Sequence, residues 1–590
     1  MATSNSQNTI PFPGRRPLKV YAFDPSLGRM LGNHLTLDVR YEPLKPGPVG
    51  ARFAVVDYDG NAKMFYEAVD LDHPAILLRG GLDPTESDPR FHQQMVYAVA
   101  SETLERFEVA LGRRIRWRHA KSRTAPLKLF PHALKQANAF YSRDAGGILF
   151  GYFQASQDTQ GDVLPGQTIF TCLSHDIIAH EVTHAVIDGI RQYFTEPTNI
   201  DVAAFHEAFA DLAALFRHFS HQEALIEALQ RTGGRLYGPS LRAEASDGTE
   251  NSPIGGQLAS DNPLVFLARQ FGMVSGHGVG LRDAIDQKAD PNDIRVLTEP
   301  HARGSILVAA MFDAYFTTYI RRTADLFRIY RAGSGQANPV DLPMPLATLL
   351  AERASKTAEM FFQICARALD YCPPVDITFG DFLRAVITAD TDLYPVDAHR
   401  VREAIMQAFR RRGITPDGAG YFSEEALRWP DAPSELPPVN GLVFGDPNGL
   451  TDQEKAINAP ILRRYAKDNA ALLGFDPTQG RIAAPSFHPM FRLGEDGVLR
   501  IDMVVEFIQT TTEWFDPAIP ELGKFEMRGG VTVMIASPPF EGEQRGEPRV
   551  RYVIPRKRSK ERFECQRSAF AAGGMMTSDH RIDFALVHGA

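Results

Sequence analysis

Residues 174–190 read SHDIIAHEVTHAVIDGI and carry the most informative motif of the sequence. This stretch contains no helix breaker before Gly189, so it predicts a helix. At 3.6 residues per turn, His180 and His184 lie on one face, and two imidazoles at this spacing can bind one Zn²⁺ ion. Glu181 is rotated from His180 by about 100°, so it can reach a water on the metal rather than the metal itself.

Two explanations other than a zinc site are possible for the HExxH pentapeptide. It arises by chance roughly 3 times per 100 chains of this length if residues are independent. Two histidines can also be hydrogen-bonded in a core without binding metal. The neighbouring helix is therefore needed to choose between these readings.

Residues 202–219, VAAFHEAFADLAALFRHF, are apolar on almost every face and predict a buried helix. Glu207 and Asp211 are four residues apart, on one side of that helix. Because a buried carboxylate needs a cation or strong donors, Glu207 is a candidate third metal ligand. Asp211 is a candidate acceptor for the free ring N–H of a ligand histidine. The alternative is that both carboxylates pair with arginines or cap backbone groups.

Together these residues resemble the thermolysin-like zinc metallopeptidases, the gluzincins with an HExxH helix and a downstream ExxxD helix. The resemblance covers about residues 85–415. The matching segments are AHEVTHAV at 179–186, HEAFAD at 206–211, NAFY at 138–141, and His301 with Gly304 and Ser305 before an apolar helix.

The resemblance implies an α+β fold with a thermolysin-like two-lobed domain at residues 85–415. Its β-rich lobe would comprise residues 85–173 and its helical lobe residues 174–415. The implied activity is that of a zinc metalloendopeptidase with one Zn²⁺ per chain and a protein or peptide substrate. The implied roles are metal binding by His180, His184 and Glu207, general-base catalysis by Glu181, oxyanion stabilisation by His301, support of a ligand histidine by Asp211, and substrate binding by Asn138 and Ala139 on an edge strand.

The sequence departs from the family pattern after the HExxH helix. The family's catalytic tyrosine has no clean match, because Thr195 is nearest by counting and Tyr193 and Phe194 flank it. Tyr193 is the candidate replacement for the oxyanion contact.

Two other family features are incompletely matched. The acidic partner of His301 stays open between Glu299 and Asp293. Asp176 matches one calcium-ligand position, but the downstream acidic cluster is missing, so a Ca²⁺ site is doubtful.

The flanking segments predict three further parts. Residues 1–84 alternate like short strands and form a β-rich N-terminal region. The Pro-rich residues 416–441 predict a linker, and residues 442–590 a separate α+β C-terminal domain of unknown role. The basic run at 555–567, PRKRSKERFECQR, is interpreted as a solvated hairpin turn between two strands rather than a nucleic-acid site. The C-terminal domain could instead contact a partner protein.

Composition narrows the class of protein. The 590 residues carry 63 basic and 72 acidic side chains, a net charge of −9, so no nucleic-acid binding is expected. No apolar run is long enough to span a membrane, and the N-terminus lacks a secretory signal. The expected compartment is the cytoplasm, with non-classical export left open.

The sequence has three alternative interpretations besides an active endopeptidase. One is a catalytically weak or inactive zinc-containing binding or scaffold protein of the same fold, which the missing tyrosine favours. An aminopeptidase of the same group is unlikely because the sequence has no GxMEN signature. A latent enzyme, with the N-terminal region or the C-terminal tail over the cleft, is the third.

Overall fold

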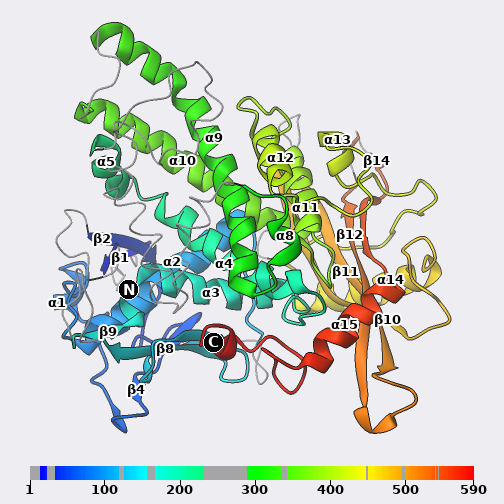
Figure 1. The fold of residues 1–590 in the computed structure, drawn as a ribbon, viewed down its shortest axis with the longest axis horizontal. Helices are drawn as coiled ribbons and strands as arrows, with labels where there is room; N and C mark the ends of the chain where they lie inside the picture. Colours follow the sequence, from blue (N-terminus) through cyan, green and yellow to red (C-terminus); the bar gives the residue numbers. More distant parts are fainter. Residues whose placement is uncertain are drawn as a thin grey trace, which may run out of the picture. The chain divides into compact units, whose positions relative to one another are not determined.

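The computed structural model describes residues 14–22, 25, 33–118, 125–155, 166–231, 289–334, 342–446, 449–493, 499–538, 540–541 and 544–589. Residues 232–288, part of the predicted helical lobe, lie outside this set. The chain divides into two compact units, Met1–Arg106 with His119–Val182, and Phe107–Arg118 with Thr183–Ala590. Helices and strands both occur in the described residues, which confirms the α+β class (Figure 1).

The first unit is built on a five-stranded mixed sheet. Its described strands are ordered β3 (Phe53–Val55), β6 (Leu127–Leu134), β8 (Gly147–Gln154) and β7 (Ala139–Ser142), with β9 (Thr168–Phe170) paired to the end of β8. The pairs β3–β6 and β6–β8 are parallel, whereas β7 is antiparallel to β8. Among the described strands, β7 therefore lies at one edge of this sheet.

Smaller elements complete the first unit. The strands β1 (Arg15–Tyr21) and β2 (His34–Arg40) form an antiparallel pair, as do β4 (Tyr58–Asp59) and β5 (Met64–Phe65). The helices are α1 (Pro74–Leu77), most of α2 (Pro89–Leu111), the 3₁₀ turn η2 (Thr171–Leu173) and the first half of α3 (His175–Ile190). Both α2 and α3 are continuous helices that contribute residues to each unit.

Two long helices of the second unit pack against α4 (Ile200–His218). Helix α4 packs against α9 (Pro300–Ser334) and α10 (Met344–Ala368) (Figure 1). The remaining helices of this part are α5 (Gln222–Arg231), α8 (Asp293–Val296), η4 (Leu369–Tyr371), α11 (Phe379–Leu393), α12 (Val401–Arg411) and α13 (Glu424–Leu427). Almost all of α4 is buried, as its apolar sequence predicts.

Two contacts bring α9 close to α4. A Cβ atom added at Gly304 of α9 would lie 2.9 Å from the Ala204 carbonyl oxygen of α4, so only glycine permits this approach. One helical turn before Ala204 on α4, the Asp201 carboxylate binds the guanidinium of Arg303, which precedes Gly304, at 2.6 Å. These contacts fix the first turn of α9, which carries His301, beside α4.

The C-terminal residues form a four-stranded antiparallel sheet in the second unit. Its order is β10 (Arg481–Leu493), β11 (Leu499–Trp514), β12 (Lys524–Ala536) and β15 (Arg549–Arg556). Helix α14 (Asp452–Asp468) shares one hydrophobic cluster with this sheet, through Leu462, Val505 and Val533. The other elements are η5 (Pro520–Leu522), β13 (Phe540–Glu541), β14 (Gln544–Arg545), α15 (Lys560–Ala572) and α16 (Phe584–Val587).

The interpretation of the basic run as a hairpin turn is wrong. The first strand exists as β15, but the residues that follow form helix α15. Ser559 caps this helix, because its hydroxyl oxygen accepts a hydrogen bond from the Arg562 backbone N–H. Residues 560–572 contain no β-branched residue, which favours the helix over a strand.

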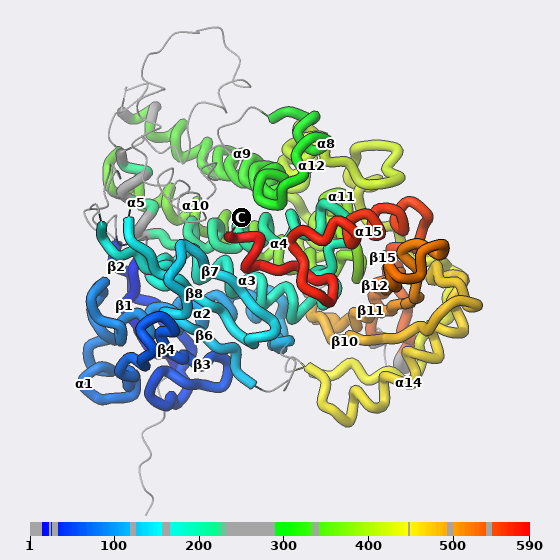
Figure 2. Tube along the Cα trace, turned by 60° about the horizontal axis from the view of Figure 1, so that its bottom comes forward, coloured from blue at the N-terminus to red at the C-terminus, as the bar shows by residue number. Residues whose placement is uncertain are grey.

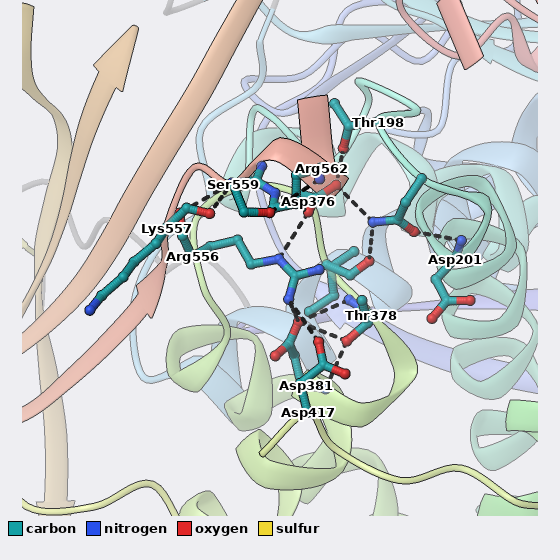
Figure 3. A network of polar contacts seen from close by, with 12 residues as sticks. Thr198, Asp201, Asp376, Thr378, Asp381, Asp417, Arg556, Lys557, Ser559 and Arg562 are labelled. Carbon is teal, nitrogen blue, oxygen red and sulfur yellow. Dashed lines mark hydrogen bonds and ion pairs between the residues drawn. The ribbon is translucent and has the colours of Figure 1, made fainter. Parts of the chain in front are cut away.

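Asp376 connects this C-terminal part to the start of α4 (Figure 3). Its carboxylate accepts hydrogen bonds from the Thr198 hydroxyl at 2.6 Å and from the side-chain amide of Asn199, the N-cap of α4, at 2.8 Å. It also binds Arg556 at 2.9 Å and Arg562 at 2.5 Å. Burial raises the pKa of Asp376, but the two guanidinium groups outweigh it and hold that pKa below its usual value.

We expect Asp376→Asn to destabilise the second unit by about 3–5 kcal/mol, because it removes the carboxylate that the largely buried Arg556 and Arg562 both bind. Asparagine tolerates the positive φ of 56° at this position, so the loss of charge is isolated. Thermal unfolding measures the effect. The control is Asp417→Asn, whose exposed side chain lies 3.7 Å from Arg556 and should contribute less than about 1 kcal/mol. Equal melting temperatures for the two variants would contradict the role of Asp376.

Among the described residues, no helix combines the length and the hydropathy needed to cross a membrane.

Candidate metal centre

The HExxH residues lie on α3, as the sequence predicts. The side chains of His180, Glu181 and His184 are all buried. The division between the two units falls inside this continuous helix, after Val182.

Glu207 on α4 provides the carboxylate. It is 1% exposed, and its Oε1 atom lies 3.6 Å from Nε2 of His184. His180, His184, Glu207 and His588 each offer one ligand atom, and these atoms all lie within 4.8 Å of one another. Imidazole nitrogens and a carboxylate oxygen are the donors of protein zinc sites, so this donor set fits Zn²⁺.

His301 lies in the first turn of α9, on the other side of the Glu207 carboxylate. Its Nε2 atom is 3.3 Å from Oε2 of Glu207, and its Nδ1 atom is 3.0 Å from Oε1 of Glu299. The partner of His301 is thus Glu299, which also accepts the backbone N–H groups of His301 and Ala302 and so caps α9. Asp293 lies at the start of the separate helix α8.

The two carboxylates around His301 shift its proton affinity. Burial lowers the pKa of His301, but attraction to Glu207 and hydrogen bonds to Glu207 and Glu299 outweigh it and raise that pKa to about 9. Burial raises the pKa of Glu299, but the hydrogen bonds from His301 and from the backbone lower it to about 2. Glu299 is therefore a carboxylate that orients the His301 ring.

Glu181 contacts the end strand of the first unit's sheet. Its Oε2 atom accepts a hydrogen bond from the Tyr141 backbone N–H of β7 at 2.9 Å. The Asn138 carbonyl accepts from Gly151 of β8, so the backbone groups of Ala139 and Tyr141, one and three residues on, point away from β8. The candidate base thus contacts the outer edge of β7, which also carries the backbone groups of Ala139, whereas the Asn138 carbonyl faces β8.

Tyr193 contacts the C-terminal sheet. The Arg528 guanidinium of β12 lies 4.9 Å from the centre of the Tyr193 ring, and Arg528 also binds Glu196 at 2.6 Å. Tyr193 is therefore packed against the C-terminal sheet. Asp211 is partly buried, one turn after Glu207 on α4, and its support of a ligand histidine stays a prediction.

The sequence reasoning missed two histidines. Nδ1 of His206 lies 3.3 Å from Nδ1 of His184, so the two rings can share one proton. Nε2 of His588 lies 3.2 Å from Oε2 of Glu207. His206 could have been noticed as the residue before Glu207 on a buried helix. His588 is a lone histidine in the tail, and no spacing relates it to the HExxH motif.

A second buried group, His92, His132 and Cys172, is explained without metal. Asp57 binds Nδ1 of His132 at 2.6 Å, and Nε2 of His132 lies 2.8 Å from Nδ1 of His92. Nε2 of His92 in turn contacts the Glu86 carbonyl oxygen at 3.1 Å. Each ring nitrogen of the two histidines thus has a protein partner, and the hydrogen bonds account for both rings without a metal ion.

No protein-family model matches this chain, and a search of the curated proteins gives no match either. The case for a metal centre therefore rests on the residues and their geometry.

The purified protein should contain about one zinc ion per chain, and His184→Ala should remove it, because the change deletes one of the donors. Elemental analysis after gel filtration measures the content. The control is His399→Ala, which deletes an exposed histidine between α11 and α12 and should leave the zinc in place. Full zinc content in His184→Ala would exclude this cluster as the binding site.

Proposed function

We propose that this chain is a zinc-dependent metalloendopeptidase with a protein or peptide substrate. The observation that carries the proposal is the approach of His180, His184 and Glu207 to one another, with Glu181 beside them on α3. These three donors would hold the ion. A bound zinc ion would polarise the scissile carbonyl and lower the pKa of a water molecule.

Glu181 would act as the general base. It would accept a proton from the attacking water and pass it to the leaving amine. The hydrogen bond from the Tyr141 backbone N–H holds one carboxylate oxygen in place, which supports a fixed orientation of the base. The geometry therefore favours proton transfer by this residue over metal binding.

His301 would donate a hydrogen bond to the oxyanion that forms during attack. Its Nε2 atom lies next to Glu207, and Glu299 holds the opposite nitrogen. A ring fixed in this way by a carboxylate needs little reorganisation to stabilise the developing charge. Tyr193 has no part in this proposal.

The strand β7 would align the substrate. Its outer edge carries the contact to Glu181, and an extended peptide added along that edge would lie beside the base. Asn138 and Ala139 would make the substrate contacts, within a thermolysin-like two-lobed domain at about residues 85–415.

A catalytically weak or inactive zinc-containing protein is the second candidate. The contact of His588 with Glu207 favours it, because zinc sites with four protein ligands are structural, whereas catalytic sites keep a position for water. The two candidates differ in turnover and share the metal.

Glu181→Gln should keep the zinc and lower casein hydrolysis by about 10²-fold or more, because glutamine cannot accept the proton. The comparison is made in the parent chain and in a His588→Ala background, so that the tail does not conceal activity. Chelator-treated samples give the metal-independent baseline. Hydrolysis that persists in Glu181→Gln would remove this residue as the base, and zinc-loaded protein without hydrolysis in either background would favour the second candidate.

A further inference from the structure

The last residues of the chain reach the candidate metal centre. Figure 2 shows this segment, in red, running from α15 past α4 to the C-terminus. The short helix α16 carries two large apolar side chains, Phe584 and Val587, which are 4% and 1% exposed. His588 follows directly and is also buried. The segment is thus part of the interior of the second unit rather than an exposed tail.

The segment contacts the proposed ligands through two side chains. The Phe584 ring lies 4.3 Å from the His184 ring and 5.3 Å from the His206 ring, measured between centroids. Nε2 of His588 lies 3.2 Å from Oε2 of Glu207. Phe584 thus covers one ligand, and His588 adds a fourth donor to the same group.

Contacts upstream hold the segment in this position. The Ile582 backbone N–H donates to the Thr195 carbonyl oxygen at 2.7 Å, in the connection between α3 and α4. The His580 ring stacks on Phe570 of α15, with centroids 4.5 Å apart. Asp583 caps α16 by accepting the Ala585 backbone N–H. These upstream contacts specify the position of His588.

We propose that His588 is a fourth protein ligand of the metal ion and that residues 582–589 mask the centre. This inference rests on the proposed function, because it assumes the zinc site of His180, His184 and Glu207. A peptidase needs one ligand position for water and for the substrate carbonyl. His588 takes that position, so the full chain is a latent enzyme.

Two glycines, Gly573 and Gly574, separate the masking segment from α15. Helix α15 ends at Gly573, whose φ of +66° is the left-handed conformation that stops a helix, and Gly574 follows. Beyond this pair, the backbone hydrogen bond of Ile582 and the burial of α16 attach the segment to the helices. Displacement of residues 575–590 would open the fourth position while leaving α15 and its contacts to Asp376 intact.

The first experiment asks whether His588 binds the metal. The protein is loaded with Co²⁺, whose visible absorption reports its ligands, and His588→Ala and His588→Gln are compared with the parent chain. Both spectra should change, and competition with a chromophoric chelator should show that zinc affinity falls by about tenfold or more. The matched control is Leu586→Ala, on the same helix with a side chain that is 49% exposed, which should change neither. Thermal unfolding checks that the variants are folded.

The second experiment asks whether the segment masks the site. Casein hydrolysis by His588→Ala should exceed that of the parent chain and of Leu586→Ala by about tenfold or more, and Glu181→Gln should abolish the gain. Cobalt spectra of folded His588 variants that coincide with the parent spectrum would overturn the ligand assignment. Measurable hydrolysis at equal rates by the parent chain and His588→Ala would overturn the mask while leaving the proposed function standing.

The results distinguish failure of the His588 proposal from failure of the proposed peptidase function. Altered cobalt spectra without hydrolysis in any variant would keep His588 as a ligand, refute the latent enzyme and refute the proposed peptidase. Absence of metal binding by the parent chain would refute both.

Discussion

The buried carboxylate of Glu207 is the constraint on which the candidate site depends. It lies within 3.6 Å of ring nitrogens from His184, His301 and His588, on three separate segments. A carboxylate taken out of water costs several kcal/mol unless positive charge or hydrogen-bond donors compensate. Imidazoles supply such donors, and a divalent cation would supply more. The convergence of α3, α9 and the C-terminal segment on α4 therefore has an electrostatic cause.

The position of α4 is secured at its beginning and along its length. Asn199 caps its first turn, and the Asn199 side chain is held by Asp376 together with Arg556 and Arg562 from the C-terminal part. Further along, the absence of a side chain at Gly304 lets α9 lie against the α4 backbone. The C-terminal sheet and α15 thus support the helix that carries Glu207, so this part of the chain contributes to the site through packing as well as through His588.

The latent-enzyme and scaffold interpretations share the same atoms. Three donors from α3 and α4 make a centre suited to hydrolysis, and a fourth donor makes one suited to a structural ion. The difference lies in whether a short terminal segment leaves its place. In the proposed peptidase, a mask made by the same chain would prevent hydrolysis until the segment is displaced.

Neighbouring residues are enough to predict the local features of the candidate site. The spacing of His180, Glu181 and His184 and the buried helix around Glu207 follow from helical geometry, which depends only on neighbouring residues. The hairpin prediction at residues 555–567 is wrong although its correction is also local, because Ser559 caps the helix α15 that begins there. Two other contacts depend on the folded structure: Arg528 packs on Tyr193, and His588 meets Glu207 from 381 residues away. Contacts at such separations arise from the packing of whole elements, and packing leaves no periodic signal in the sequence from which they could be inferred.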